Sequence, residues 1–472
     1  MPRPSAPDRP CADRRVAPVR DGRGRGLPAC CALVGPGPAP GSWLRRHLPG
    51  LLGALLLLLG APTARAQDLI ARYLPADVPG FGTAPGVTVA SRIRPLYQPL
   101  GLRFGLIAAH PRLDLGFGYD SDATGLAGGK GSWLIDTAPS LALGAAWDRD
   151  RIGAFFSLDD RRAPGQAAAD RTDGTAAAGA RLHAGMQTLH LAAARMALHE
   201  DGSEVGALPT DRPVPFTLTT LRAADRLRLG RLSLTPSLGL TAWRYGAASL
   251  GGVALAQTYR DRDVLAGGVR ADYALAGRES AVLVLRGLRT RYIAPQAGAP
   301  SRDSTGLMAL AGFDDAADGL WHERLLLGWE TRAFAAPQYR THSGPIVAAE
   351  VSFSPDGMTT LTAALSRRIE DAAQEGVAGY TATSARLALD QEMRRNLLLH
   401  ASAALTQAAF LQGGGTETGT TFAASLTWLL NRRMRVVADE RLTTLHAAPV
   451  AGAAGGGNTL RSVSLVTLGF GW

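Results

Sequence analysis

Eight histidines follow residue 66, and their spacing is the first test for a metal or catalytic site. None forms a His-x-His or His-Glu-x-x-His pair, the spacings that bring two imidazoles to one metal ion. The eight are His110, His183, His190, His199, His322, His342, His400 and His446. They are best explained as wall or rim residues, and we expect no metal site.

Two pairs of adjacent carboxylates, Asp159-Asp160 and Asp314-Asp315, could in principle support acid–base chemistry. Both pairs adjoin charged turns or loops, where solvation explains them more simply. Gly128 to Gly131 superficially resembles a phosphate-binding loop, but the spacing and the following helix of that motif are absent. The sequence therefore predicts neither an enzyme nor a cofactor.

The N-terminal part has the features of a secretory signal. The apolar run from Leu51 to Leu59 follows two arginines and precedes Ala64-Arg65-Ala66, a small-residue cleavage site. The run is too short for a membrane-spanning helix. We expect residues 1–66 to be an N-terminal extension with a signal peptide, and cleavage after Ala66.

Cleavage would change the charge balance. The whole chain has 50 basic and 40 acidic residues, of which residues 1–66 hold 10 and 3, so residues 67–472 carry 40 and 37. All three cysteines, Cys11, Cys30 and Cys31, also lie before residue 66. The mature chain is then nearly neutral and free of cysteine, which argues against nucleic-acid binding, disulfides and thiol chemistry.

Alternation with a period of two residues dominates the rest of the chain. From Arg231 to Trp243, leucines and Ala242 occupy one face while serines, threonines and glycine occupy the other. Similar segments recur to the C-terminus, with short connections alternating with longer ones. This indicates an all-β fold: a transmembrane antiparallel up-and-down β-barrel of about eighteen strands, or sixteen, with short periplasmic turns and longer extracellular loops.

The domain organisation follows from this pattern. Residues 67–100 are rich in proline and lack a period, which predicts an N-terminal periplasmic segment, and residues 101–472 would form the barrel. The last strand places Leu468, Phe470 and Trp472 on one apolar face. We expect it to close the wall against the first strand, near Leu102 to Tyr119, and to present its aromatic residues to the barrel-assembly machinery.

The entry segment from Arg92 to Gly105, with His110-Pro111-Arg112-Leu113 and Gly116 to Asp120 after it, resembles the start of the outer-membrane beta-barrel porins of type two. Leu96 stands where those chains usually have an acidic residue, and His110 replaces a tyrosine. The resemblance covers roughly residues 90 to 472. It implies a barrel in the outer membrane of a Gram-negative bacterium and says little about the solute.

Arginines recur on the polar faces of the expected strands, together with a few acidic residues. The candidate lumen-lining residues are Arg222, Arg226, Arg228, Arg262, Arg270, Glu350, Arg433, Arg435, Asp439 and Arg441. Two interpretations stay open: these groups pair across the wall and keep the interior polar, or they form a cationic lining that favours anions.

The expected function is a passive, porin-like channel for small hydrophilic solutes, which would include anions if the arginines form a cationic lining. The alternatives are an accessory barrel for exopolysaccharide or surface-glycan export and a structural or adhesive barrel. Expected partners are outer-membrane lipid and lipopolysaccharide, periplasmic chaperones, the assembly machinery, and a glycan or small anion. The sequence predicts no nucleic-acid partner and does not indicate an oligomeric state.

Overall fold

The computed structural model describes residues 73–75, 78–81, 88–126, 128–275, 279–295, 298–315, 320–412, 415–447 and 457–472. The chain divides into two units, Met1–Leu57 and Leu58–Trp472, and the described residues all belong to the second. The predicted cleavage site at Ala64 and Ala66 lies outside them.

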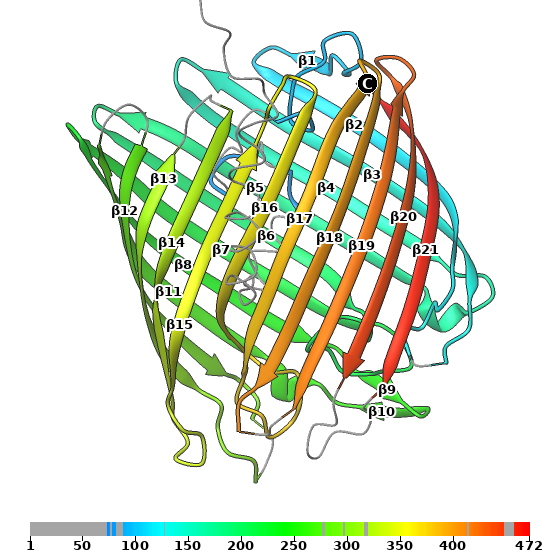
Figure 1. Cartoon of the computed structure of the whole chain (residues 1–472), viewed down its shortest axis with the longest axis vertical. Coiled ribbons are helices and arrows are strands. Elements are labelled where there is room, and N and C mark those ends of the chain that lie inside the picture. Colours follow the sequence, from blue (N-terminus) through cyan, green and yellow to red (C-terminus); the bar gives the residue numbers. More distant parts are fainter. Residues whose placement is uncertain are drawn as a thin grey trace, which may run out of the picture. The chain divides into compact units, whose positions relative to one another are not determined.

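The described chain is almost entirely β-strand (Figure 1). The long strands are β2 (Ile107–Asp120), β3 (Ser132–Trp147), β4 (Asp150–Arg162), β5 (Arg171–Ala184), β6 (Gln187–Glu200), β7 (Val214–Leu229), β8 (Leu232–Tyr245), β11 (Arg262–Ala274), β12 (Glu279–Tyr292), β13 (Ser304–Asp315), β14 (Trp321–Phe334), β15 (His342–Phe353), β16 (Thr359–Glu370), β17 (Tyr380–Arg394), β18 (Leu397–Phe410), β19 (Thr416–Leu429), β20 (Met434–Ala447) and β21 (Asn458–Gly471). Shorter elements are β1 (Leu102–Phe104), β9 (Ala248–Leu250), β10 (Val253–Leu255) and the 3₁₀ turns η1 (Ala167–Ala169) and η2 (Thr258–Arg260). Among the described residues, no helix is long and apolar enough to cross a bilayer.

The long strands close into a barrel. The described sheet has nineteen strands, and because β1 pairs only with β2, the other eighteen form the ring. The ring closes where β2 pairs antiparallel with β21, from Arg112 opposite Gly471 to Asp120 opposite Val463. The predicted fold class is confirmed, with eighteen strands rather than sixteen. Closure of the wall by the last strand against the first is confirmed as well.

Each strand has one exposed apolar face and one more buried face. On β8, Leu238 is 58% exposed whereas Trp243, on the opposite face, is 3% exposed. The buried faces contact one another across non-adjacent strands, as Arg262 of β11 does with the residue after β16, so these faces line the interior. The exposed leucines point outward, which is the arrangement that a surrounding lipid phase stabilises.

The two ends of the barrel differ. Short turns join the strands at one end, called the turn end here, where β1 and the C-terminus also lie, at the top of Figure 1. Longer connections join them at the other end, the loop end. One predicted boundary was wrong. The expected first strand is broken at Gly105 (φ +61°), so that β1 folds back on β2. The connection between β8 and β11 carries the β9–β10 hairpin and η2.

Candidate functional site: the barrel interior

The structure places nearly all of the predicted lumen-lining residues on inward faces. On β7, every second side chain from the buried Phe216 and Leu218 onward faces the interior, and Arg222, Arg226 and Arg228 lie on that face. By the same criterion the inward faces carry Arg262 and Arg270 on β11, Glu350 on β15, and Arg435, Asp439 and Arg441 on β20. Arg433 differs, because it is exposed in the turn before β20 and belongs to no strand.

Several of these arginines pair with carboxylates in the wall. Arg270 donates to Asp272 and Asp314 at 2.7 and 2.6 Å. The Nη2 atom of Arg435 lies 2.9 Å from both carboxylate oxygens of Asp114. For Arg270 and Arg435, the structure therefore has the first of the two arrangements considered above, in which the arginine pairs with a carboxylate of the wall.

A second group of inward arginines has no ion pair with a carboxylate among the described residues. We call it the cationic wall: Arg151 on β4, Arg181 on β5, and Arg222, Arg226 and Arg228 on β7. Arg151 and Arg181 are directly opposite in the strand register, an arrangement of like charges that is unfavourable without an anion nearby. Between β3 and β8 the inward carboxylates all lie in the loop-end half of the barrel; they are Asp136, Asp159, Asp173 and Glu200. The turn-end half of this wall is therefore positive.

Part of the N-terminal segment lies along the inner wall. This N-terminal strap comprises the described residues 73–75, 78–81 and 88–100. A Cβ atom at Gly179 would lie 1.8 Å from the carbonyl oxygen of Pro79, so only glycine allows this close approach. Gly80 (φ +85°) rests against Ala192, and a Cβ there would lie 3.0 Å from the Ala192 Cβ.

The strap is fixed at the turn end by polar contacts. Arg94 forms an ion pair with Glu392 of β17 at 2.7 Å, and both side chains are largely buried. The amide of Val89 donates to the hydroxyl of Thr360 on β16 at 3.2 Å. The strap thus runs from the interior to the turn end and reduces the space beside β4 to β6.

The strap also covers an apolar cluster on the inner wall. Leu74 packs with Met196 and Leu218, and with three stacked rings, Phe216, Trp243 and Tyr245. The rings are only 8%, 3% and 7% exposed. They stabilise the contact between the strap and the wall by excluding water, and they offer little free surface to a passing solute.

Loops at the loop end fold inward and are held by buried ion pairs. Asp371, the first residue after β16, accepts from Nε of Arg262 at 2.9 Å and from Nη2 of Arg332 at 2.7 Å. Nearby, Arg302 donates to the carbonyl oxygens of Ala372 and Tyr259 at 3.0 and 2.9 Å. Burial acts to raise the pKa of Asp371, but the charges of Arg332, Arg262 and Arg302 outweigh it and hold the pKa below the ordinary aspartate value.

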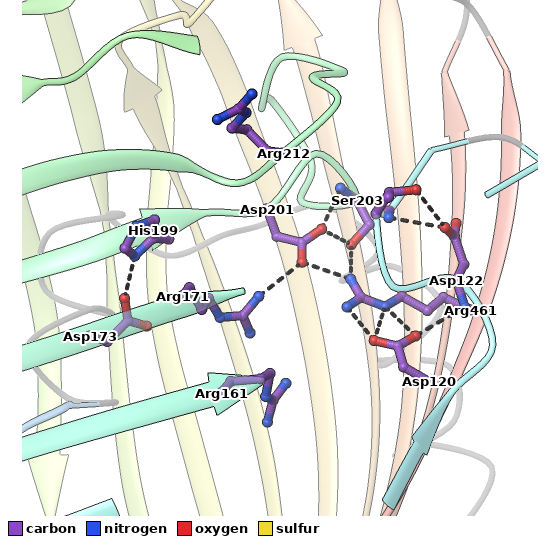
Figure 2. Close-up of polar contacts among 12 residues, drawn as sticks. Asp120, Asp122, Arg161, Arg171, Asp173, His199, Asp201, Ser203, Arg212 and Arg461 are labelled. Atoms are coloured by element: carbon purple, nitrogen blue, oxygen red, sulfur yellow. Dashed lines mark hydrogen bonds and ion pairs between the residues drawn. The ribbon is translucent and has the colours of Figure 1, made fainter. Parts of the chain in front are cut away.

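A second ion-pair cluster joins the first and last strands to the β6–β7 loop (Figure 2). Arg461 of β21 lies between Asp120 of β2, at 2.6 Å, and Asp201, at 2.7 Å, while Arg171 approaches Asp201 at 3.5 Å. Burial acts to raise the pKa of Asp201, but Arg461 and Arg171 hold it below its usual value. This loop therefore carries a fixed negative charge that the arginines neutralise.

The β6–β7 loop continues across the loop end. The amide of Gly206 donates to Glu417 of β19 at 2.6 Å, and Val205 packs beside Tyr380 and Phe410. These strands lie far from β6 around the ring, so the loop crosses the mouth of the barrel rather than following its rim. Together with the β16–β17 loop, it narrows the loop end.

Several of these groups escaped the sequence prediction, including Asp120, Asp201, Arg332, Asp371 and Arg461. Arg332 and Arg461 do alternate with inward residues, so strand periodicity could have identified them. The two loop aspartates, Asp201 and Asp371, carry no periodic signal. Their only mark in the sequence is that each directly follows a strand. Among the described residues, no group of three or more histidine, aspartate or glutamate side chains could hold a metal ion.

A closed ring of eighteen antiparallel strands, apolar outside and charged inside, with short turns at one end and inward-folded loops at the other, defines a porin-like barrel of the outer-membrane type. This architecture supports a channel. The chain belongs to the family described as Putative beta-barrel porin 2, whose model matches residues 94–456. No curated protein matches the sequence.

Three solved structures are similar to this chain at low sequence identity. The outer membrane protein OpdK from Pseudomonas aeruginosa is 13% identical, covering 77% of this chain and 99% of that one, with a TM-score of 0.40. OccK2 from the same organism is 13% identical over 77% and 98%, with a TM-score of 0.42. The FrpB iron transporter from Neisseria meningitidis is 9% identical over 77% and 81%, with a TM-score of 0.42.

Proposed function

We propose that the protein is a passive channel in the outer membrane of a Gram-negative bacterium that favours small anionic solutes. The observation that carries the proposal is the cationic wall. Other inward arginines, such as Arg262, Arg270 and Arg435, have a carboxylate within hydrogen-bonding distance. The cationic wall has none among the described residues, so its charge acts on the solutes that pass.

The route follows from what occupies the interior. The N-terminal strap covers the wall at β4 to β6, and the inward loops narrow the loop end. A solute that crosses must pass beside the strap, close to Arg222, because Arg222 is the register partner of Ala192, against which Gly80 rests. The narrowed interior brings the solute within a few ångströms of positive charge, where screening by salt is weakest.

Export of a polysaccharide is less well supported. A glycan track requires accessible aromatic rings along the route, and inward rings such as Phe216, Trp243 and Tyr245 are at most 8% exposed. Most tryptophans face outward instead; Trp133, Trp329 and Trp428 are each more than half exposed to the surroundings of the barrel. That position is typical of membrane-interface residues.

The experiment is a reversal-potential measurement in planar bilayers under a potassium chloride gradient. We expect a chloride preference in the wild type and a weaker one in Arg226→Gln/Arg228→Gln. Arg289→Gln is the matched control, because that arginine is exposed on the outward face of β12. A preference for potassium would overturn the anionic selectivity, and purified folded protein without conductance would overturn the channel itself.

A further inference from the structure

Arg286 of β12 was not among the residues expected from the sequence, yet it faces the interior close to Arg222 of β7. Two strands, β8 and β11, separate them. Arg222 is opposite Gly239, which is opposite Ala266; Arg286 is opposite Gly268, which is opposite Ser237. The two arginines therefore stand on the same stretch of wall, where three strand spacings and a two-residue offset along the strand place their Cα atoms about 16 Å apart.

The wall between the two arginines is made of small residues. The four inward positions are Ser237 and Gly239 on β8, and Ala266 and Gly268 on β11. A Cβ atom at Gly239 would lie 4.0 Å from the Cγ atom of Arg222, so the Arg222 side chain lies beside this position of β8. Because these four residues are small, they leave space above the wall in which the two long arginine side chains can reach the same solute.

Neither guanidinium has a partner among the described residues, in contrast to Arg262, Arg270 and Arg332. The positive charge of Arg286 acts on Arg222, and that of Arg368 acts on Arg286; both interactions are repulsive. Both side chains are half-buried, so water screens them incompletely. The ten N–H donors of these two guanidiniums therefore have no acceptor among the described residues, and a bound anion would relieve both the repulsion and the missing hydrogen bonds.

The position suits a subsite on the permeation route. Arg222 and Arg286 each lie near the middle of their strands. The strap lies on the other side of Arg222, because Gly80 rests against Ala192, the register partner of Arg222. The solute is thus confined to the side on which Arg286 stands.

We propose that Arg222 and Arg286 form a mid-barrel binding subsite for a small dianion, with each guanidinium binding one end of a dicarboxylate. This deepens the proposed function and rests on it. Two planar guanidiniums over a floor of small residues favour two separated carboxylates over a single charge, because each fork can accept one carboxylate in bidentate geometry. A monoanion can engage only one of the two at a time.

The test measures how succinate blocks the chloride current of single channels, with butyrate as the monoanion of the same carbon number. We expect succinate to block the wild type at about tenfold lower concentration than butyrate, and Arg222→Gln and Arg286→Gln each to remove this difference. The double variant should lose little more of this difference between succinate and butyrate than either single variant does, because the subsite needs both arginines. Arg228→Gln is the matched control, which lowers chloride preference but leaves the difference between succinate and butyrate in place.

Two results would overturn the subsite. One is an unchanged succinate block in both single variants, and the other is a loss of succinate block in Arg228→Gln that is as large as in those variants. In either case an intact chloride preference leaves the proposed channel function standing, so the two failures are distinguishable. Heat-modifiable migration on gels confirms that each variant is a folded barrel. Arg222→Lys is the second variant if the glutamine variant does not fold; it keeps the charge but loses the fork, and should retain chloride preference while the succinate block weakens.

Discussion

The substitution Asp371→Asn tests whether the inward loops are held by buried charge. The Asp371 carboxylate accepts from Arg262 and Arg332, whose side chains are themselves almost fully buried. Removing the negative charge leaves two buried cations without compensation. Breaking a buried ion pair from one side typically costs about 3 to 5 kcal/mol. Because about 1.4 kcal/mol is a factor of ten, the undocked population of the loop should rise roughly 150- to 5,000-fold. Asparagine keeps one acceptor, so we expect the lower end.

The assay exploits the absence of cysteine from residues 67–472. Ala373, two residues beyond Asp371, is 1% exposed, so Ala373→Cys should react with a membrane-impermeant thiol reagent only when the loop undocks. We expect labelling to be at least about a hundredfold faster with Asp371→Asn than without it. The control is Asp356→Asn at the turn end, whose carboxylate accepts only from nearby groups such as the Met358 amide, and which should leave the rate unchanged.

The pH dependence of labelling is an independent test of the same carboxylate. The pKa of Asp371 in the docked loop lies below the ordinary aspartate pKa. The stabilisation of the docked loop by this carboxylate is therefore complete at pH values above the ordinary pKa, and it is lost as the pH falls through the lowered pKa. Because the reagent reacts with the thiolate, the labelling rate is expressed relative to that of an exposed cysteine at the same pH. This relative rate for Ala373→Cys should stay low at neutral and mildly acidic pH and rise only below about pH 4. Equal labelling rates with and without Asp371→Asn would refute the assignment of the ion pairs as the restraint on this loop.

Two further predictions concern the strap and the last strand. Deletion of residues 73–81 should increase single-channel conductance by vacating the wall at β4 to β6, and Gly179→Ala should act in the same direction because its Cβ would overlap the Pro79 carbonyl; a conductance equal to that of the wild type would count against an occluding strap. Removal of Trp472, which is 44% exposed beyond the end of β21, should lower the amount of barrel in the outer membrane more than Arg228→Gln does, as measured by fractionation and heat-modifiable migration; normal levels of the truncated chain would contradict a role in assembly.

Strand periodicity made the barrel predictable because it is a local property. The alternation from Leu232 to Tyr245 determines which face of β8 meets the surroundings, and it survives even at Pro236, where the pairing of β7 with β8 is interrupted. The same alternation placed Arg222 and Arg262 correctly on inward faces. It could not show that Arg262 has a carboxylate partner whereas Arg222 has none among the described residues.

The contacts that shape the interior are non-local, which explains why they escaped the sequence. Arg461 and Asp201 are 260 residues apart, and no pattern near either residue indicates the other. The strap lacks a period of its own, and its position depends on glycines in the wall, such as Gly179, that resemble every other glycine in a strand. Strand periodicity therefore predicted a polar interior but not where it would be narrow.

The seam between β2 and β21 has a consequence for the kinetics of folding. It joins residues such as Ser121 and Ser462, which are 341 positions apart, so it is among the most non-local pairings in the described sheet. Pairings of this kind form late, because the chain between them must first be ordered. Until the seam forms, both strands are unpaired edges that can add a strand from another molecule. Closure of the ring cannot protect a partly folded barrel from aggregation. The barrel stops exposing unpaired strand edges only when the last strand pairing has formed.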